Sequence, residues 1–226
     1  MNSVLKEILG SKQVSDGKEV LELTSAMDER EGALLAKVIN HVRPASSLEV
    51  GLAYGVSTLF ICEALAKLDM PVRHIAIDPF QFSQWRGIGI RNIELAGYRH
   101  LVELREELSE IALPKLLSER TVLDLALIDG WHTFDHALVD FFYINKMLRV
   151  GGVLVLDDSW MPAIGKLIDH VLTYRCYRIF AVPSDHGALG WRMAYYAGLK
   201  RAKWPSAIAL EKIAEDDRSW DWYKPF

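Results

Sequence analysis

The amino-acid sequence predicts an α/β fold, a doubly wound and mostly parallel sheet with helices on both faces, followed by an antiparallel hairpin. Strand-like and helix-like apolar patterns alternate along the chain. The strand-like run at 123–128 is strongly apolar and the one at 153–156 is uninterrupted, a pattern without alternation that is typical of strands buried on both faces. Several of these runs end at a glycine or an acidic residue, and ligands bind at such strand ends in doubly wound sheets.

The elements follow from the spacing of apolar residues. From about residue 14 to residue 42 apolar side chains recur at helical spacing, and Pro44 ends this predicted helix. A short strand at 47–50, a glycine turn and a helix through 59–65 come next. The following elements are predicted as strand 72–77, helix 88–96, strand 101–104, helix 109–117, strand 123–128, helix 137–148 and strand 153–156.

The hairpin is predicted from two apolar runs, 177–182 and 189–196, which flank the turn residues 183–187. Residues from 200 onward are mixed in character and rich in tryptophan, which is consistent with a helix and a docked tail. The sequence therefore predicts three parts, which are an N-terminal helical cap (1–44), a main domain (45–198) and a C-terminal tail (199–226).

Composition narrows the class of protein. The 226 residues carry 30 acidic and 26 basic side chains, a net charge of −4, and their number suits one mid-sized domain. The longest uncharged stretch has 13 residues, short of the roughly 20 of a membrane span, and the N-terminus has no secretory pattern. Cys62 and Cys176 lie far apart without a CxxC pair, which favours a cytoplasmic protein. The sequence has no block of basic residues that could neutralise a phosphate backbone, which argues against nucleic acid as the main partner.

A glycine turn and an acidic residue at neighbouring strand ends predict an adenosine-type cofactor. Gly51 and Gly55 allow a tight turn before a helix, whose free N–H groups face a ligand. The third glycine of a dinucleotide fingerprint is missing, and Glu49 would repel a pyrophosphate but suits the cationic end of a sulfonium ligand. Asp78 ends the second strand, where a carboxylate can accept both ribose hydroxyls. In the alternative reading, these residues only shape a turn and cap a helix.

Four motifs in succession carry a family resemblance. EVGLAYGVS, IDPF, IDGWH and VLDDS stand at successive strand ends. In this order they resemble class I S-adenosylmethionine (SAM)-dependent methyltransferases, and most of all the metal-dependent catechol O-methyltransferase-like group. The substrate end is also similar to macrolide-sugar O-methyltransferases and cephalosporin-hydroxylase-like proteins. The resemblance covers residues 46–196 and implies a Rossmann-like sheet of seven strands with the last antiparallel.

The resemblance also implies a set of cofactor contacts. The glycine turn would line the methionine part of SAM, Asp78 would hold the ribose, and Ser109 and Trp131 would contact the adenine. The expected cofactor-binding residues are Glu49, Gly51, Tyr54, Gly55, Ser57, Asp78, Ser109, Asp129 and Trp131. For Trp131 the alternative stays equally open that it is only a half-buried aromatic residue on a loop.

Three carboxylates predict a metal site. Asp129 ends the fourth strand, and Asp157 and Asp158 end the fifth. Neighbouring strands run about 4.8 Å apart, so these groups can converge on one ion, and a set of oxygen ligands suits Mg²⁺. The resembled family binds a divalent cation with acids, or with Asn at the third place, at these positions. Helix capping by the Asp157–Asp158 pair is the alternative.

His132 is the predicted general base. It stands three residues after Asp129, where the catechol group has a lysine, and its ordinary pKa suits deprotonation of a hydroxyl. The histidine favours the sugar-methylating relatives. His136 is interpreted as a surface residue, and Asp135 and Asp140 as charges on the helix face. Trp160 and Met161 could form a substrate wall or pack in the core.

Together these features predict an enzyme that transfers a methyl group from SAM to a hydroxyl of a small molecule, with His132 and Asp129 as catalytic residues. Two alternatives stay open, a metal-independent methyltransferase and a non-catalytic cofactor-binding module. A nucleic-acid methyltransferase is disfavoured because IDGWH replaces that subclass's N/D-P-P-Y/F loop, and an oxidoreductase because the glycine fingerprint is incomplete. The N-terminal and C-terminal segments are expected to cover the acceptor pocket or to form a homodimer contact.

Overall fold

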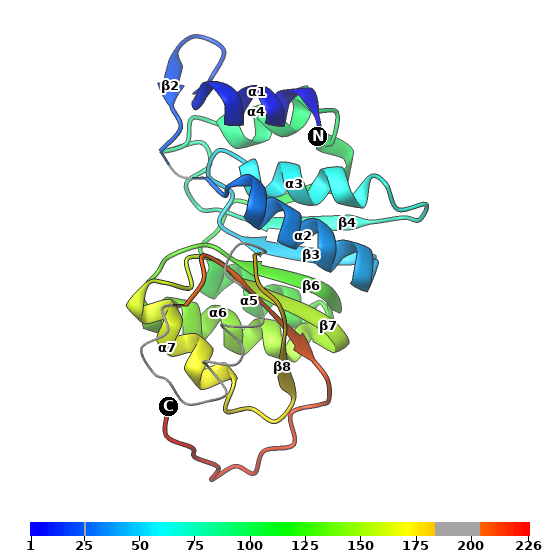
Figure 1. The fold of residues 1–226 in the computed structure, drawn as a ribbon, viewed down its shortest axis with the longest axis vertical. Coiled ribbons are helices and arrows are strands. Elements are labelled where there is room, and N and C mark those ends of the chain that lie inside the picture. The colour runs from blue at the N-terminus through cyan, green and yellow to red at the C-terminus, as the bar shows by residue number, and fades with distance from the viewer. Residues whose placement is uncertain (25, 184–203) are drawn as a thin grey trace.

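The central feature of the structure, a computed structural model, is a mixed sheet flanked by helices (Figure 1). The structure describes residues 1–24, 26–183 and 204–226. In this part of the chain the sheet has seven strands in the order β5-β4-β3-β6-β7-β9-β8, and β9 alone runs antiparallel to its neighbours. The strands are β3 (Ser46–Val50), β4 (Arg73–Ile77), β5 (Val102–Arg105), β6 (Leu123–Ile128), β7 (Leu148–Leu156), β8 (Tyr177–Ala181) and β9 (Ile208–Lys212).

Helices cover both faces of this sheet, as predicted for a doubly wound fold. Those of one layer are α2 (Glu29–Val42), α3 (Val56–Leu65) and α4 (Ile88–Leu95), joined by α1 (Ser3–Ser11), and those of the other layer are α5 (Ser109–Ser118), α6 (Phe134–Met147) and α7 (Pro162–Val171). In β7, Val153 and Val155 pack on the first layer, whereas Leu154 and Leu156 pack on the second. This two-sided burial explains the uninterrupted apolar run.

The register of the parallel strands brings four chain segments to one edge of the sheet. Val50 lies opposite Ile77 and Ile128, and Ile128 lies opposite Leu156. The residue after each strand continues the ladder, for example Asp129 N to the Val50 carbonyl at 2.9 Å and Asp157 N to the Ile128 carbonyl at 3.1 Å. The polar residues that follow β3, β4, β6 and β7 therefore share this edge, as the sequence predicts.

The N-terminal region differs from the helical segment predicted over about 14–42. A two-stranded hairpin, β1 (Gln13–Ser15) and β2 (Val20–Glu22), precedes α2. Asp16 forms the turn, because its carboxylate accepts the backbone N–H groups of Lys18 and Glu19, both at 2.8 Å. The helix itself begins only after Asp28, which forms a capping box with Glu31. Local turn and cap chemistry overrides the helical spacing of apolar residues here.

The C-terminal hairpin is present, but its last strand lies later in the chain than predicted. The strand predicted at 177–182 is confirmed as β8, whereas the one predicted at 189–196 lies outside the described residues. The partner of β8 is β9, within the predicted tail. The charged residues at the end of β9 are not typical of a buried strand. Lys212 is nevertheless buried, because its ammonium group donates to the carbonyls of Asn145 and Leu148 at 2.9 and 2.8 Å.

Residues after β9 dock on the second helix layer. The Arg218 guanidinium stacks over the Tyr174 ring at 3.3 Å, and the Phe226 ring stacks on Phe134. Within the described ranges, none of the helices combines the length and apolar character required to cross a membrane.

Candidate active site

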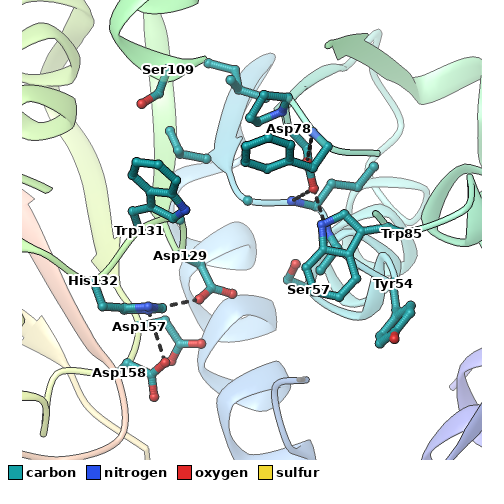
Figure 2. Close-up of a pocket in the computed structure, with 18 of the residues that line it drawn as sticks. Tyr54, Ser57, Asp78, Trp85, Ser109, Asp129, Trp131, His132, Asp157 and Asp158 are labelled. Atoms are coloured by element: carbon teal, nitrogen blue, oxygen red, sulfur yellow. Dashed lines mark hydrogen bonds and ion pairs between the residues drawn. The ribbon is translucent and has the colours of Figure 1, made fainter. Parts of the chain in front are cut away.

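A cavity of about 550 Å³ opens at the sheet edge where β3, β4, β6 and β7 end (Figure 2). Its walls come from the loops after these strands and from the start of α5 and α6. The N-terminal segment closes another side with Thr24, Met27 and Glu31. Among described residues, none of the tail from 204 onward lines it. The N-terminal region is therefore the one that shapes this cavity, and the tail packs elsewhere.

The glycine turn after β3 has the geometry that the sequence predicts. Gly51 has a φ of +96°, and a Cβ there would collide with the backbone carbonyl of Asp129. Gly55 has a φ of +78°, and its Cβ would come within 3.0 Å of the Gly89 carbonyl oxygen. Only glycine combines this left-handed conformation with such close approach. Gly51 thus allows the turn to lie directly against the loop after β6, and Gly55 allows it to lie against the start of α4.

Asp78 holds the glycine turn in place from the end of β4. Its Oδ2 accepts the backbone N–H groups of Leu52 and Ala53 at 3.2 and 2.8 Å, and its Oδ1 accepts that of Phe80 at 2.8 Å. The side chain is buried but lines the cavity. A carboxylate has about four acceptor sites, so Asp78 retains capacity for a ligand hydroxyl.

Glu49 lies behind the cavity wall rather than on it. Its carboxylate is fully buried and accepts the hydroxyl of Ser57 at 2.9 Å and that of Thr58, while His74 Nε2 lies 3.2 Å away. The Ser47 hydroxyl contacts the other ring nitrogen of His74 at 2.9 Å. Of the predicted pair Glu49 and Ser57, only Ser57 lines the cavity. This buried network was not predicted from the sequence, and it orients Ser57 from the side of the wall that faces away from the cavity.

Asp129, His132 and Asp158 form a compact polar cluster at one side of the cavity. His132 Nε2 lies 3.7 Å from Asp129 Oδ1 and 3.1 Å from Asp158 Oδ2. These carboxylates, Asp129 first, raise the pKa of His132 to about 10. Burial raises the pKa of Asp129 to about 6, against the lowering effect of His132, whereas the contact with His132 lowers the pKa of Asp158. His132 is thus the cationic partner of the two acids.

Asp157 completes the acidic group from the end of β7. It is 7% exposed and lines the cavity. Burial, followed by the charge of Asp129, raises its pKa well above the usual range for a carboxyl group. Two acids that both resist ionisation in one buried place favour a cationic ligand between them.

The cluster fits a divalent cation in its donor types. One oxygen each of Asp129 and Asp158 and one nitrogen of His132 lie within 4.8 Å of one another. The predicted metal ligands were Asp129, Asp157 and Asp158, and the structure also places a nitrogen of His132 beside Asp129 and Asp158. Carboxylate oxygens suit Mg²⁺ or Mn²⁺, whereas a set that includes the imidazole nitrogen would suit Zn²⁺.

Aromatic side chains line other parts of the cavity wall. The rings of Phe80 and Trp131 are near-parallel, with planes at 28° and centroids 6.4 Å apart, and Ser109 lines the same cavity at the start of α5. His136, predicted as a surface residue, lines the cavity and packs edge-on against Trp131 at 4.6 Å. Tyr54, an expected cofactor contact, lines the wall and makes an edge contact with Trp85. Trp85 also lines the cavity and was not predicted from the sequence.

Asp140 is not the helix-face surface charge that was predicted. It is 1% exposed and lines the cavity from α6, whereas Asp135 on the same helix is exposed. A signal was present, because Asp140 shares helical spacing with the buried residues Ala137 and Ile144. Trp160 is 49% exposed and donates from Nε1 to Asp158 at 2.9 Å, so it lies at the surface beside the cluster rather than in the core.

Comparisons with known proteins agree with this geometry. Residues 48–159 match the model of a family described as a methyltransferase domain. Catechol O-methyltransferase B of Danio rerio is 28% identical over 154 residues, which cover 66% of this chain and 56% of that protein. The chain thus spans little more than half the length of this relative.

Two solved structures share the fold. The O-methyltransferase TomG of Streptomyces achromogenes, involved in tomaymycin synthesis and solved with SAM, has a TM-score of 0.67 at 16% identity, over 95% of this chain and 91% of that one. An O-methyltransferase from Bacillus cereus, solved with SAH, has a TM-score of 0.66 at 16% identity, over 95% and 92%. The predicted methyltransferase-like fold is therefore confirmed.

Proposed function

Because residues 48–159 match the model of a family of methyltransferase domains, we propose that this protein transfers a methyl group from SAM to a hydroxyl of a small molecule. The acceptor class that we propose is a sugar or a secondary metabolite. One observation carries the proposal. A single cavity joins the glycine turn and Asp78 to the cluster of Asp129, His132 and Asp158, so cofactor and acceptor can meet in it.

The cofactor would lie along the edge of the sheet. Asp78 would accept the ribose hydroxyls, and the glycine turn with Ser57 would hold the methionine part beside Tyr54. Trp131 and Ser109 would contact the adenine. The sulfonium charge suits a cavity lined by Glu31, Asp129, Asp157 and Asp158, because opposite charges attract strongly where water is scarce.

The acceptor would bind between the polar cluster and the N-terminal wall. The acceptor oxygen forms the new bond to the methyl carbon as the bond from that carbon to sulfur breaks, and the bonding pair leaves with sulfur. The hydroxyl proton passes to His132 Nε2, between the two carboxylates. Positioning of the oxygen in line with that bond supplies much of the acceleration.

His132 must be neutral before it can accept this proton. Its pKa of about 10 means that the free enzyme holds a proton on the imidazole at neutral pH. Asp129 and Asp158 stabilise that charged form, which is also the form that proton transfer generates.

Asp129 and Asp158, with Asp157 beside them, are the residues that would hold a divalent cation. When bound, such an ion supplies a positive charge that lowers the pKa of the acceptor hydroxyl. The same charge next to these carboxylates favours the neutral imidazole of His132. The residues thus agree with cation-assisted proton removal.

A metal-independent transfer is the second candidate, and one contact favours it. His132 Nε2 lies 3.1 Å from Asp158 and already provides a positive charge beside the acids. In that case the imidazolium would orient the acceptor oxygen, and the acids would serve to hold His132.

The proposal is tested by transfer of radiolabelled methyl from SAM to a panel of sugars, catechols and other phenols. Reactions contain Mg²⁺ or a chelator. Labelled product with Mg²⁺ supports the proposal, and its loss on chelation assigns the cation role. Tight SAH binding without methylation of any compound in the panel would instead favour a non-catalytic binding module.

A further inference from the structure

Asp140 is a buried carboxylate in the cavity wall for which the proposed reaction has no role. It lies in the second turn of α6, is 1% exposed, and lines the cavity. Its Oδ1 atom is buried and has no hydrogen-bond partner among the described residues. A buried polar atom without a partner is costly and rare in native proteins. The structure therefore leaves an acceptor unfilled in this part of the cavity wall.

The surroundings of Asp140 also point to a ligand with a hydrogen-bond donor. Burial raises the pKa of Asp140 to about 6, against the lowering effect of a hydrogen bond from Ser109, and Ser109 lines the same cavity. At neutral pH the carboxylate is thus ionised and can only accept hydrogen bonds. His136 and Glu110 are the other charged or titratable residues that act on it, with opposite effects.

We propose that Asp140 accepts a hydrogen bond from the exocyclic amino group of the cofactor's adenine and so selects adenine over a 6-oxopurine. This inference rests on the proposed binding of SAM. Ser109, which is hydrogen-bonded to Asp140, and Trp131 line the same cavity, and Figure 2 shows Trp131 between Ser109 and the cluster of His132 and Asp158. With the ribose on Asp78, the base extends toward Ser109 and the wall formed by α6.

The chemistry of the purine edge makes the role specific. The 6-amino group of adenine is a donor, whereas the 6-oxo group of hypoxanthine is an acceptor that would face a carboxylate. A site that lacks a matching donor rejects a ligand because both polar groups stay unpaired. Asp140 and Ser109 would thus both contact the base, and the Asp140 carboxylate would be the group that discriminates adenine from a 6-oxopurine.

A purely structural role is the competing explanation. α5 begins at Ser109 without a side-chain cap from Leu108, so Asp140 could simply stabilise the positive end of that helix. That role predicts a change in stability after substitution, with no change in the preference between two bases. The choice between bases therefore separates the two explanations.

The experiment measures the Kd of SAH and of its 6-oxo analogue, S-inosylhomocysteine, by calorimetry on the full chain. Wild-type protein should bind SAH at least about tenfold more tightly than the analogue. In Asp140→Asn, whose amide can donate to a 6-oxo group, the ratio should fall to within about threefold. Asp69→Asn, the same charge change at an exposed residue outside the cavity, should keep the wild-type ratio.

The ratio of two affinities in one sample does not depend on the folded fraction, so partial unfolding of a variant does not mask the result. An unchanged ratio in Asp140→Asn overturns the inference, as does wild-type protein that binds both compounds equally or neither. Wild-type protein that discriminates the bases but methylates no acceptor would contradict the proposed function and leave the assignment of Asp140 supported.

Discussion

The two ends of the cavity are built in different ways. At the end assigned to the nucleoside, Asp78 is held by three backbone N–H groups, those of Leu52, Ala53 and Phe80. At the end assigned to chemistry, Asp129, His132 and Asp158 are held mainly by one another, and their pKa values are shifted in both directions.

This difference separates binding from reactivity. The three backbone hydrogen bonds to Asp78 form without a ligand, so the nucleoside end is preorganised. The polar cluster depends on which charges and protons are present. Substitutions at the two ends should therefore change different quantities, and each of the following predictions tests that separation.

The largest expected effect is on turnover after loss of His132. In His132→Ala, kcat should fall by about 10² to 10⁴, the usual contribution of a general base, while the Kd of SAH stays within about threefold. The measurements are labelled methyl transfer and calorimetric titration with SAH. His100→Ala, at an exposed residue outside the cavity, is the control and should leave both values unchanged. Full turnover in His132→Ala would exclude His132 as the base.

Removal of divalent cations should have the next largest effect, again only on chemistry. Exhaustive chelation is expected to lower the rate at least about 100-fold, because the hydroxyl loses the charge that acidifies it. SAH affinity should change little, and added Mg²⁺ should restore the rate. Undiminished transfer in the chelated enzyme would rule out the cation and favour the metal-independent route.

Loss of Asp78 should have the opposite signature. Asp78→Ala removes the ribose acceptor and the partner of three backbone N–H groups, so the Kd of SAH should rise by about tenfold or more. At saturating SAM, turnover should fall much less than in His132→Ala. A variant with normal SAH affinity and lost turnover would contradict the assignment of this end to the nucleoside.

The last predicted effect is on stability rather than on activity and concerns the pH dependence at Asp140. Its folded pKa of about 6 is above the ordinary value of 3.8, so its contribution to stability is fully present below pH 3.8 and is lost as the pH rises through 6. The Asn side chain of Asp140→Asn does not ionise, so this loss of stability with rising pH is absent in the variant. Relative to wild type, the variant should gain up to about 3 kcal/mol between pH 4 and pH 7. Urea unfolding at both pH values measures this, and an equal difference at both would argue against the buried charge.

The sheet and the edge that carries the site were predictable because they depend on strong local patterns. A strongly apolar run predicted β6 and an uninterrupted one predicted the end of β7, and the acids after them marked the strand ends. Because neighbouring parallel strands end at the same edge of the sheet, the proximity of Asp129 and Asp158 followed from the predicted strand ends alone.

What failed depended on interactions that apolar spacing does not encode. The hairpin at β1 and β2 depends on the Asp16 turn, and β9 contains a lysine whose burial is satisfied by distant carbonyls of Asn145 and Leu148. Asp140 was assigned to the surface by its charge, although its helical spacing placed it with Ile144 on the buried face. Residue type alone was misleading where pairing or a cavity accommodates a charge.

The central claim is that one cavity holds SAM with its sulfur toward the cluster of Asp129, His132 and Asp158. The most direct test is a crystal structure of the protein grown with SAH and Mg²⁺. The account predicts ribose hydroxyls on Asp78 and the sulfur atom on the side of the cavity where His132 lies. A nucleoside bound in the reverse direction, or bound outside this cavity, would contradict it.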